Sequence, residues 1–283
     1  EDFLAEYKSV IDNPDVYWQG LADKYKIDYA LLHPISPHSK NLIKYLYKNK
    51  NWILSYFDES GVVFLNNLRI PATCWVMPTF RELDIENYPK ADRLLTVMSF
   101  ANFFLYTEQY QKARPLYAEV LKIDPDFAEA YINLGAIFIA EKKYGDANAC
   151  YYRAIQESNK YAEPYLGLAI LDIERKNYEM ALFFLGEALR IKPIYPEAQF
   201  LLCYVYVRTK NYDGAINLCK EMISRNPADE KLYNIFGAAY YQKDEYENAL
   251  KQFKKAVEIN PDYAEAKQNY NACLDKIKDA GGK

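Results

Sequence analysis

The sequence has little of what phosphate loops, metal centres and membrane spans require. Among its 283 residues are 10 glycines and two histidines, and no run of glycines lies between a strand and a helix to bind phosphate. No apolar run reaches the roughly 18–20 residues of a membrane-spanning helix. The acidic start, Glu1-Asp2-Phe3, lacks the basic residues of a signal peptide. We expect this chain to be soluble as given, and an upstream membrane anchor stays open.

An excess of charge of either sign is also missing. The formal net charge is −4. Residues 1–90 carry 10 basic and 12 acidic side chains, and residues 91–283 carry 25 and 27. Neither part offers the basic surface that neutralisation of phosphates needs, so nucleic acid is not an expected partner.

What the sequence does contain is a period of 34 residues. The recurring tyrosines are Tyr110, Tyr144, Tyr178, Tyr212 and Tyr246, and each is followed three residues later by an alanine: Ala113, Ala147, Ala181, Ala215 and Ala249. Four units close with a proline: Pro125, Pro193, Pro227 and Pro261. A fixed period of this length, with an internal alanine and a terminal proline, resembles the tetratricopeptide repeat (TPR) family.

Other positions agree with the same register. Large apolar residues stand at Phe100, Leu134, Leu168, Leu202 and Phe236, and small residues follow them at Ala101, Gly135, Ala169, Cys203 and Gly237. A second-helix position holds Tyr117, Tyr151, Leu185, Cys219 and Phe253. The pattern in each unit predicts two amphipathic helices. At two places the sequence predicts the N-cap of the following helix and then a proline at its first position. These are Asp124-Pro125 and Asn260-Pro261.

One such hairpin cannot bury its own apolar face, so the units must stack. The resemblance therefore predicts a mainly α fold, a right-handed TPR α-solenoid of five helical hairpins and a capping helix, preceded by a small α/β unit. The expected parts are an α/β domain (1–70), an ordered linker packed on the first repeat (71–93) and the TPR array (94–279). The array divides into 94–127, 128–161, 162–195, 196–229, 230–263 and a cap, 264–279.

Residues 1–70 show a different pattern. Helical spacing is present over 3–11, from Pro14 to about Tyr25 and over 41–48. The β-rich runs 27–32, 52–57 and 62–65 are expected strands, and the residues 58–61 between the last two indicate a hairpin turn. This order favours a small α/β unit.

The same stretch resembles the extracytoplasmic segment of bacterial polytopic membrane proteins related to lipid-linked-sugar glycosyltransferases. The matching residues are Trp18, Leu21, Tyr25, Asp28, Tyr29, Leu31, Leu32, Ser36, Pro37, Leu46, Trp52, Tyr56, Asp58, Val62, Val63 and Phe64. Since the catalytic acids of that family lie in its membrane-embedded part, the resemblance assigns no catalytic residue here. It implies an extracytoplasmic or periplasmic location on a bacterial membrane; a cytoplasmic location is the alternative.

The sequence gives only weak signals for catalytic or metal-binding residues. His33 and His38 flank a proline-containing loop, but no cysteine or acidic cluster completes a metal site. Asp58 and Glu59 are adjacent turn residues, which usually only solvate a hairpin. The five cysteines follow no metal or disulfide spacing, and we interpret them as buried thiols. Cys203 and Cys219 fall on the two helices of one repeat, where they could meet. We expect no catalytic residue, no metal and no cofactor, and this fragment is not an expected enzyme.

The resemblance places ligands against the first helix of each repeat, on the concave face of the array. The transferred positions, here called the first-helix row, are Met98, Asn102, Leu105, Ile132, Ala136, Ile139, Leu166, Ile170, Ile173, Phe200, Tyr204, Val207, Asn234, Ala238 and Tyr241. The row contains no lysine to clamp a peptide carboxylate. An apolar groove suits an amphipathic helix or an extended apolar segment. Burial of the row by tight curvature or by the N-terminal unit is the alternative.

Two functions follow. The first is a non-catalytic protein–protein interaction scaffold that binds a protein or peptide in this groove, as the soluble part of a bacterial membrane protein with an upstream transmembrane anchor. The second is an accessory domain of a membrane glycosyltransferase that positions an acceptor. The sequence upstream of Glu1 would distinguish them, because several membrane helices with an acidic first loop favour the second.

Overall fold

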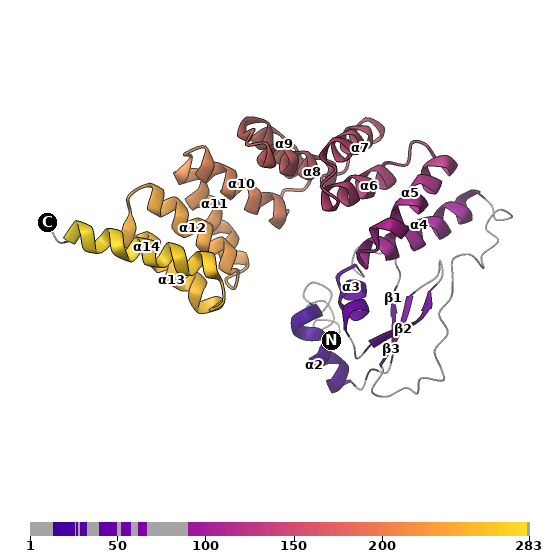
Figure 1. Ribbon diagram of the computed structural model, residues 1–283, viewed down its shortest axis with the longest axis horizontal. Helices are drawn as coiled ribbons and strands as arrows, with labels where there is room; N and C mark the ends of the chain where they lie inside the picture. The colour runs from indigo at the N-terminus through magenta and orange to yellow at the C-terminus, as the bar shows by residue number, and fades with distance from the viewer. Residues whose placement is uncertain are drawn as a thin grey trace. The chain divides into compact units, whose positions relative to one another are not determined.

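The computed structural model describes residues 14–25, 27, 29–32, 40–49, 52–57, 62–66 and 90–281. Its two compact units are Glu1–Glu157 and Ser158–Lys283, and Figure 1 shows the elements of both. The described residues form a small unit of helices and strands, followed by helical hairpins. The predicted fold class, an α-solenoid preceded by a small α/β unit, is therefore confirmed.

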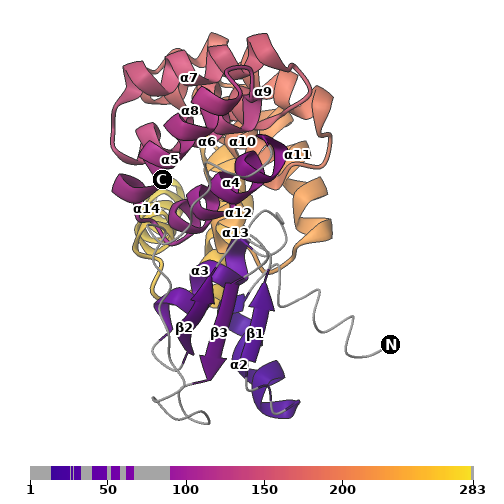
Figure 2. The same cartoon turned by 90° about the vertical axis from the view of Figure 1, so that its right-hand side faces the viewer.

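A three-stranded antiparallel sheet lies at the centre of the N-terminal part. Strand β3 (Val62–Asn66) pairs on one side with β1 (Tyr29–Leu32) and on the other with β2 (Trp52–Phe57), as Figure 2 shows. The register of the β2–β3 pair shifts between Leu54 and Tyr56, which is a bulge. These strands agree with the predicted runs.

Two helices complete this part, α2 (Pro14–Lys24) and α3 (Lys40–Lys48). The indole rings of Trp18 on α2 and Trp52 on β2 meet edge to face, with centroids 5.2 Å apart. The fully buried side chains at helical spacing on α3 are Leu42, Ile43 and Leu46.

Some of the sequence predictions fall outside the described residues. They are the helix over 3–11, the loop histidines His33 and His38, the turn 58–61 and the linker over 71–89.

Helical hairpins make up the rest of the chain. In the first unit they are α4 (Lys90–Tyr106) with α5 (Tyr110–Ile123), and α6 (Ala128–Ala140) with α7 (Tyr144–Glu157). In the second unit they are α8 (Glu163–Glu174) with α9 (Tyr178–Ile191), α10 (Pro196–Arg208) with α11 (Tyr212–Arg225), and α12 (Glu230–Gln242) with α13 (Tyr246–Ile259). Helix α14 (Ala264–Gly281) packs on α13. The second helix of every hairpin begins at a recurring tyrosine.

The α/β part is joined to the first hairpin through α3. The ring of Tyr47 packs edge to face on Phe103 of α4, with centroids 5.9 Å apart. The ammonium groups of Lys44 and Lys48 contact the Glu108 carboxylate at 2.5 and 2.7 Å. Hydrogen bonds from Lys44 and then Lys48 hold the pKa of Glu108 below its ordinary value. Within the first unit, the sheet and the first repeats share one continuous apolar core.

Every hairpin turn contains one residue in the left-handed conformation. In the third hairpin the amide of Lys176 donates to the carbonyl of Ile173 at 2.9 Å, and the amide of Asn177 donates to the carbonyl of Asp172 at 2.8 Å. This is the Schellman arrangement, which satisfies the last carbonyls of a helix. The left-handed residues recur every 34 positions, and none is glycine: Glu108, Lys142, Lys176, Lys210 and Asp244, with φ between 58° and 65°.

We expect Lys176→Gly to stabilise the protein by about 1 kcal/mol, because glycine adopts positive φ without the clash of a β-carbon. Lys176 is exposed, so little packing is lost. Chemical denaturation of both proteins measures the change. Lys176→Ala is the matched control and should give no gain, since alanine keeps the β-carbon. Equal stabilisation by both variants would show that the lysine side chain, and not the backbone, is responsible.

Within a hairpin, the two helices meet where a small residue lies against a larger one. A β-carbon added to Gly135 would stand 2.6 Å from the Tyr151 ring, and one added to Gly237 would stand 2.7 Å from the Phe253 ring. Real β-carbons essentially never come this close. The recurring small position and the recurring second-helix position therefore touch each other across the hairpin.

One local prediction was wrong. The pattern assigned Asp124 and Asn260 as N-caps of the following helices. In the structure they are the C-caps of α5 and α13, and the next helices begin at Ala128 and Ala264. The physical reason is that the residue before a proline avoids the helical conformation. The prolines therefore end one helix rather than begin the next.

Candidate functional site

Apart from Ala136, five residues of the first-helix row lie in the first unit, on α4 and α6. Met98 and Asn102 are buried, so they are part of the interior rather than of an open surface. Leu105 is half-buried and packs against the unit's core. Ile132 and Ile139 on α6 are half-buried. The first-unit part of the first-helix row is thus accessible mainly through α6.

Apart from Ala238, the second unit carries the other eight residues of the row, on α8, α10 and α12. Asn234 is buried. Phe200 and Val207 pack partly against the buried side chains of the fourth and fifth hairpins, and α10 packs against α12. The remaining members are half-buried and apolar or aromatic. We call the following residues the unit-two row: Leu166, Ile170, Ile173, Phe200, Tyr204, Val207 and Tyr241.

The asparagines of the predicted site are used inside the protein. The Tyr117 hydroxyl donates to Asn102 Oδ1 at 2.6 Å, and the Asn133 amide donates to the same oxygen at 3.2 Å. A buried amide needs such partners because an unpaired polar group in the interior is costly. Asn102 therefore holds neighbouring helices together.

Asn234 has a similar place in the fifth hairpin. Its amide donates to the Tyr263 hydroxyl and to Glu265 Oε1, both at 3.2 Å, and its Oδ1 accepts from the Asn269 amide at 2.9 Å. These contacts join α12 to the beginning of α14. Asn102 and Asn234 thus stabilise the stack, and the accessible part of the predicted site is apolar.

One cation borders the unit-two row. The Arg208 guanidinium lies 5.5 Å from the centroid of the Tyr204 ring, and its Nε donates to the Tyr178 hydroxyl at 3.4 Å. The hydrogen bond to Tyr178, followed by interactions with Tyr204, raises the pKa of Arg208. No carboxylate of the described residues forms an ion pair with it. The row is therefore apolar along its length and positively charged beside Tyr204.

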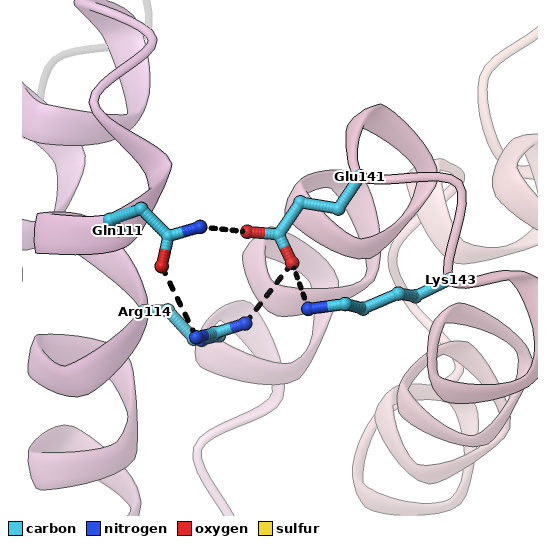
Figure 3. Close-up of polar contacts among 4 residues, drawn as sticks. All are labelled: Gln111, Arg114, Glu141 and Lys143. Carbon is cyan, nitrogen blue, oxygen red and sulfur yellow. Dashed lines mark hydrogen bonds and ion pairs between the residues drawn. The ribbon is translucent and has the colours of Figure 1, made fainter.

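A polar cluster fixes the second repeat on the first (Figure 3). Glu141, which caps α6, accepts from Gln111 at 3.1 Å, from Arg114 at 3.1 Å and from Lys143 at 2.6 Å. Its side chain is only 11% exposed. The hydrogen bond from Lys143 is the main reason that the pKa of Glu141 lies below its ordinary value, and the charge of Arg114 adds to it.

The fifth hairpin contains the charge-reversed form of this cluster. Lys243 stands three repeats after Glu141, and its ammonium contacts Asp213 at 2.7 Å and Glu245 at 3.2 Å. The same turn position thus connects successive hairpins with either sign of charge. We interpret both clusters as stabilising contacts of the stack, not as ligand sites.

We expect Glu141→Gln to lower the free energy of unfolding by about 1–2 kcal/mol at neutral pH, since charge-assisted hydrogen bonds are lost. The folded pKa of Glu141 is depressed, so its stabilisation is complete above the ordinary glutamate value of about 4.3 and disappears as pH falls through the folded value. Denaturation curves from pH 7 down to pH 3 should show the difference between the two proteins shrinking.

The control for this experiment is Glu119→Gln. Glu119 pairs with Lys122 at 2.8 Å on the surface, where its side chain is 41% exposed. Its loss should change stability by no more than about 0.5 kcal/mol. An equal effect of both substitutions, or a Glu141→Gln deficit that persists unchanged at pH 3, would contradict the assigned role of Glu141.

The thiols are poor nucleophile candidates. Burial raises the pKa of Cys150 to about 11 and also raises that of Cys273, whose Sγ donates to the carbonyl of Tyr246 at 3.1 Å. Among the described residues, no group of three or more His, Cys, Asp or Glu side chains is arranged to hold a metal ion. The helices of the described ranges include none that is both long and apolar enough to cross a membrane.

Sequence reasoning missed an exposed apolar surface on the third hairpin. Phe183 and Ile194 are 57% and 66% exposed, and Met180 is also exposed. A signal was present in the repeat register. The positions equivalent to Ile194 include Asp126 and Asp262, so an apolar residue there departs from the other repeats.

Two family models match parts of the chain. Residues 99–162 match the tetratricopeptide repeat, and residues 174–256 match subunit 3 of the anaphase-promoting complex, or cyclosome. No curated protein matches the chain at a significant level. Together with the hairpin register, these matches support a tetratricopeptide repeat protein whose described repeats form a TPR α-solenoid.

Solved structures are similar to the chain over its repeats. MamA shares 26% identity, with a TM-score of 0.51, over 59% of this chain and 92% of its own. YrrB, described as a TPR protein with an unusual peptide-binding site, shares 19% identity with a TM-score of 0.55 over 66% and 97%. PilF of Pseudomonas aeruginosa shares 19% identity with a TM-score of 0.57 over 65% and 84%. The last two show the fold alone.

Proposed function

We propose that this protein is a non-catalytic scaffold that binds an apolar peptide segment or the apolar face of a helix along the unit-two row. The observation that carries the proposal is the accessibility of this row. Seven apolar or aromatic side chains on the first helices of three hairpins remain only half-buried within their own unit. Apolar surface of this kind is commonly covered by a partner.

The stacking of the hairpins accounts for only part of the row. Stacking uses the buried positions, such as Leu168, Cys203 and Phe236, which lie in the interior. Ile170 and Tyr204, in contrast, keep part of their surface in water. TPR proteins are generally binding scaffolds rather than enzymes, and the relative YrrB is described as having a peptide-binding site. Both facts support the assignment of a protein or peptide partner.

Site-specific photo-crosslinking tests this proposal. A benzophenone side chain at Tyr204 should form a covalent adduct with the partner when irradiated in the native membrane-containing extract. The same group at Lys220, an exposed residue on the second helix α11, is the matched control and should form none. Sequencing of the adduct should identify an apolar or amphipathic segment. Adducts at Lys220 but not at Tyr204 would refute the unit-two row as the binding surface.

For location, we propose the extracytoplasmic face of a bacterial membrane, with an upstream transmembrane anchor. Support comes from the resemblance of residues 1–70 to the extracytoplasmic segment of glycosyltransferase-related membrane proteins. That resemblance also supports a second function, an accessory domain that positions an acceptor for a membrane glycosyltransferase. A topology reporter fused after Lys283, expressed with the native upstream sequence, would report the side of the membrane. A cytoplasmic signal would contradict the proposed location.

A further inference from the structure

The fourth hairpin differs from the others where its two helices meet. Cys203 on α10 occupies the recurring small position, and Cys219 on α11 occupies the recurring second-helix position. Both thiols are fully buried in one apolar cluster. In the second and fifth hairpins, the equivalent positions hold a glycine and an aromatic ring in direct contact. The fourth hairpin thus fills the same contact with two thiols.

The equivalent contact in the fifth hairpin gives the spacing. A β-carbon built on Gly237 stands 3.0 Å from Cγ of Phe253. One further carbon–carbon bond of about 1.5 Å places the two β-carbons no more than about 4.5 Å apart. Disulfides have β-carbons about 3.5–4.5 Å apart. In the fifth hairpin this pair of positions is therefore within the range of a disulfide bond, and the repeat register places Cys203 and Cys219 at the same two positions of the fourth hairpin.

The two cysteines belong to the same cluster of buried apolar side chains. The interaction with Cys203, followed by burial, raises the pKa of the Cys219 thiol well above that of a free thiol. Both cysteines are reduced in the structure. Because a buried protonated thiol reacts slowly, Cys219 is a poor nucleophile once the hairpin has closed.

We propose that Cys203 and Cys219 form an intramolecular disulfide when the chain folds in an oxidising environment. The oxidant is a disulfide, either of a small thiol or of a thiol–disulfide oxidoreductase. One thiolate attacks the oxidant's disulfide and forms a mixed disulfide, and the second thiolate then displaces the oxidant's remaining thiol. In balance, the two cysteines lose two protons and two electrons, and the oxidant's disulfide becomes two thiols. Exchange occurs before the hairpin buries both sulfurs.

This proposal is independent of the proposed function. The bond would covalently join α10 to α11, and α10 carries Phe200, Tyr204 and Val207. A cross-link between Cys203 and Cys219 closes a loop of roughly 15 residues, and such a bond stabilises mainly by restricting the unfolded chain. For a chain of this size we expect the melting temperature to rise by about 5–10 °C.

The experiment refolds the 283-residue protein from denaturant in a mixture of reduced and oxidised glutathione. Refolding exposes both thiols to the oxidant, so burial cannot block the reaction. We expect the oxidised monomer to lose two of its five thiols and about 2 Da of mass. Peptide mapping without reduction should recover one linked pair, Cys203 with Cys219. Addition of a reducing agent should reverse both the mass change and the shift in melting temperature.

Two variants complete the test. Cys203→Ala should abolish the thiol loss and the shift, and Cys150→Ala should leave both unchanged. If Cys203→Ala fails to fold, peptide mapping of the original protein still decides the question. Links to other cysteines, glutathione adducts without an internal link, or five unreacted thiols after refolding would each overturn the proposal.

Discussion

Aspartate at both Ile170 and Tyr204 should weaken partner binding at least about 100-fold, because each buried carboxylate in an apolar interface costs several kcal/mol. The two residues lie on α8 and α10, in the unit-two row, and both are half-buried in the free protein. Phe200 and Val207 are less suitable, since they pack partly against buried side chains. Binding is measured with the segment identified by photo-crosslinking, and melting curves should stay nearly unchanged.

Phe183→Asp is the matched control for this experiment. Phe183 is an aromatic residue more exposed than the row members, but it lies on the second helix α9. Its substitution should leave binding intact, as should His33→Ala and His38→Ala. If Phe183→Asp abolishes binding and the row variant binds fully, the partner uses the exposed surface of the third hairpin instead. Loss of binding in the histidine variants with full binding in the row variant would likewise contradict the site.

Replacement of Gly237 by alanine should lower the free energy of unfolding by about 1–3 kcal/mol through overpacking. The new β-carbon would stand 2.7 Å from the ring of Phe253, which is itself buried. The sign of this effect is informative. Alanine is the better helix former by about 1 kcal/mol, so propensity alone predicts stabilisation. Chemical denaturation measures the outcome.

Two further variants isolate the clash. Gly186 on α9 is exposed and has nothing within 4 Å of an added β-carbon, so Gly186→Ala should stabilise the protein. Phe253→Leu combined with Gly237→Ala reproduces the pair found in the third hairpin, Ala169 with Leu185, and should recover much of the lost stability. Stabilisation by Gly237→Ala alone would show that the two helices separate easily and that this contact does not set their spacing.

In the first hairpin, Ala101 and Tyr117 occupy the positions equivalent to Gly237 and Phe253. There the hydroxyl of Tyr117 is held by Asn102 at 2.6 Å. The fifth hairpin has Ala238 at the position equivalent to Asn102 and phenylalanine instead of tyrosine. The ring of Phe253 therefore has no corresponding polar contact. This difference leads us to expect overpacking in the fifth hairpin although the first tolerates alanine.

Helix positions in the repeats could be read from the sequence because the same local pattern occurs five times. Each unit contains two helices as the register predicts, and Tyr144 and Tyr178, for example, begin α7 and α9. Strands β2 and β3 were also predicted, since β-rich residues bounded by turn residues leave few alternatives. Boundaries were less accurate. Helix α4 begins at Lys90, ahead of position 94, and α14 extends to Gly281.

The sequence by itself determined the period, the helical hairpins and the small residues at which helices meet, because these depend on contacts repeated within each unit. Only the tertiary structure decided which predicted site residues are accessible. Asn102 and Asn234 fit a binding row by position, yet each is buried and hydrogen-bonded to a residue beyond its own hairpin, Asn133 and Asn269 respectively. Burial depends on such contacts between repeats, which no single repeat encodes, so spacing alone could not distinguish a surface asparagine from an interior one.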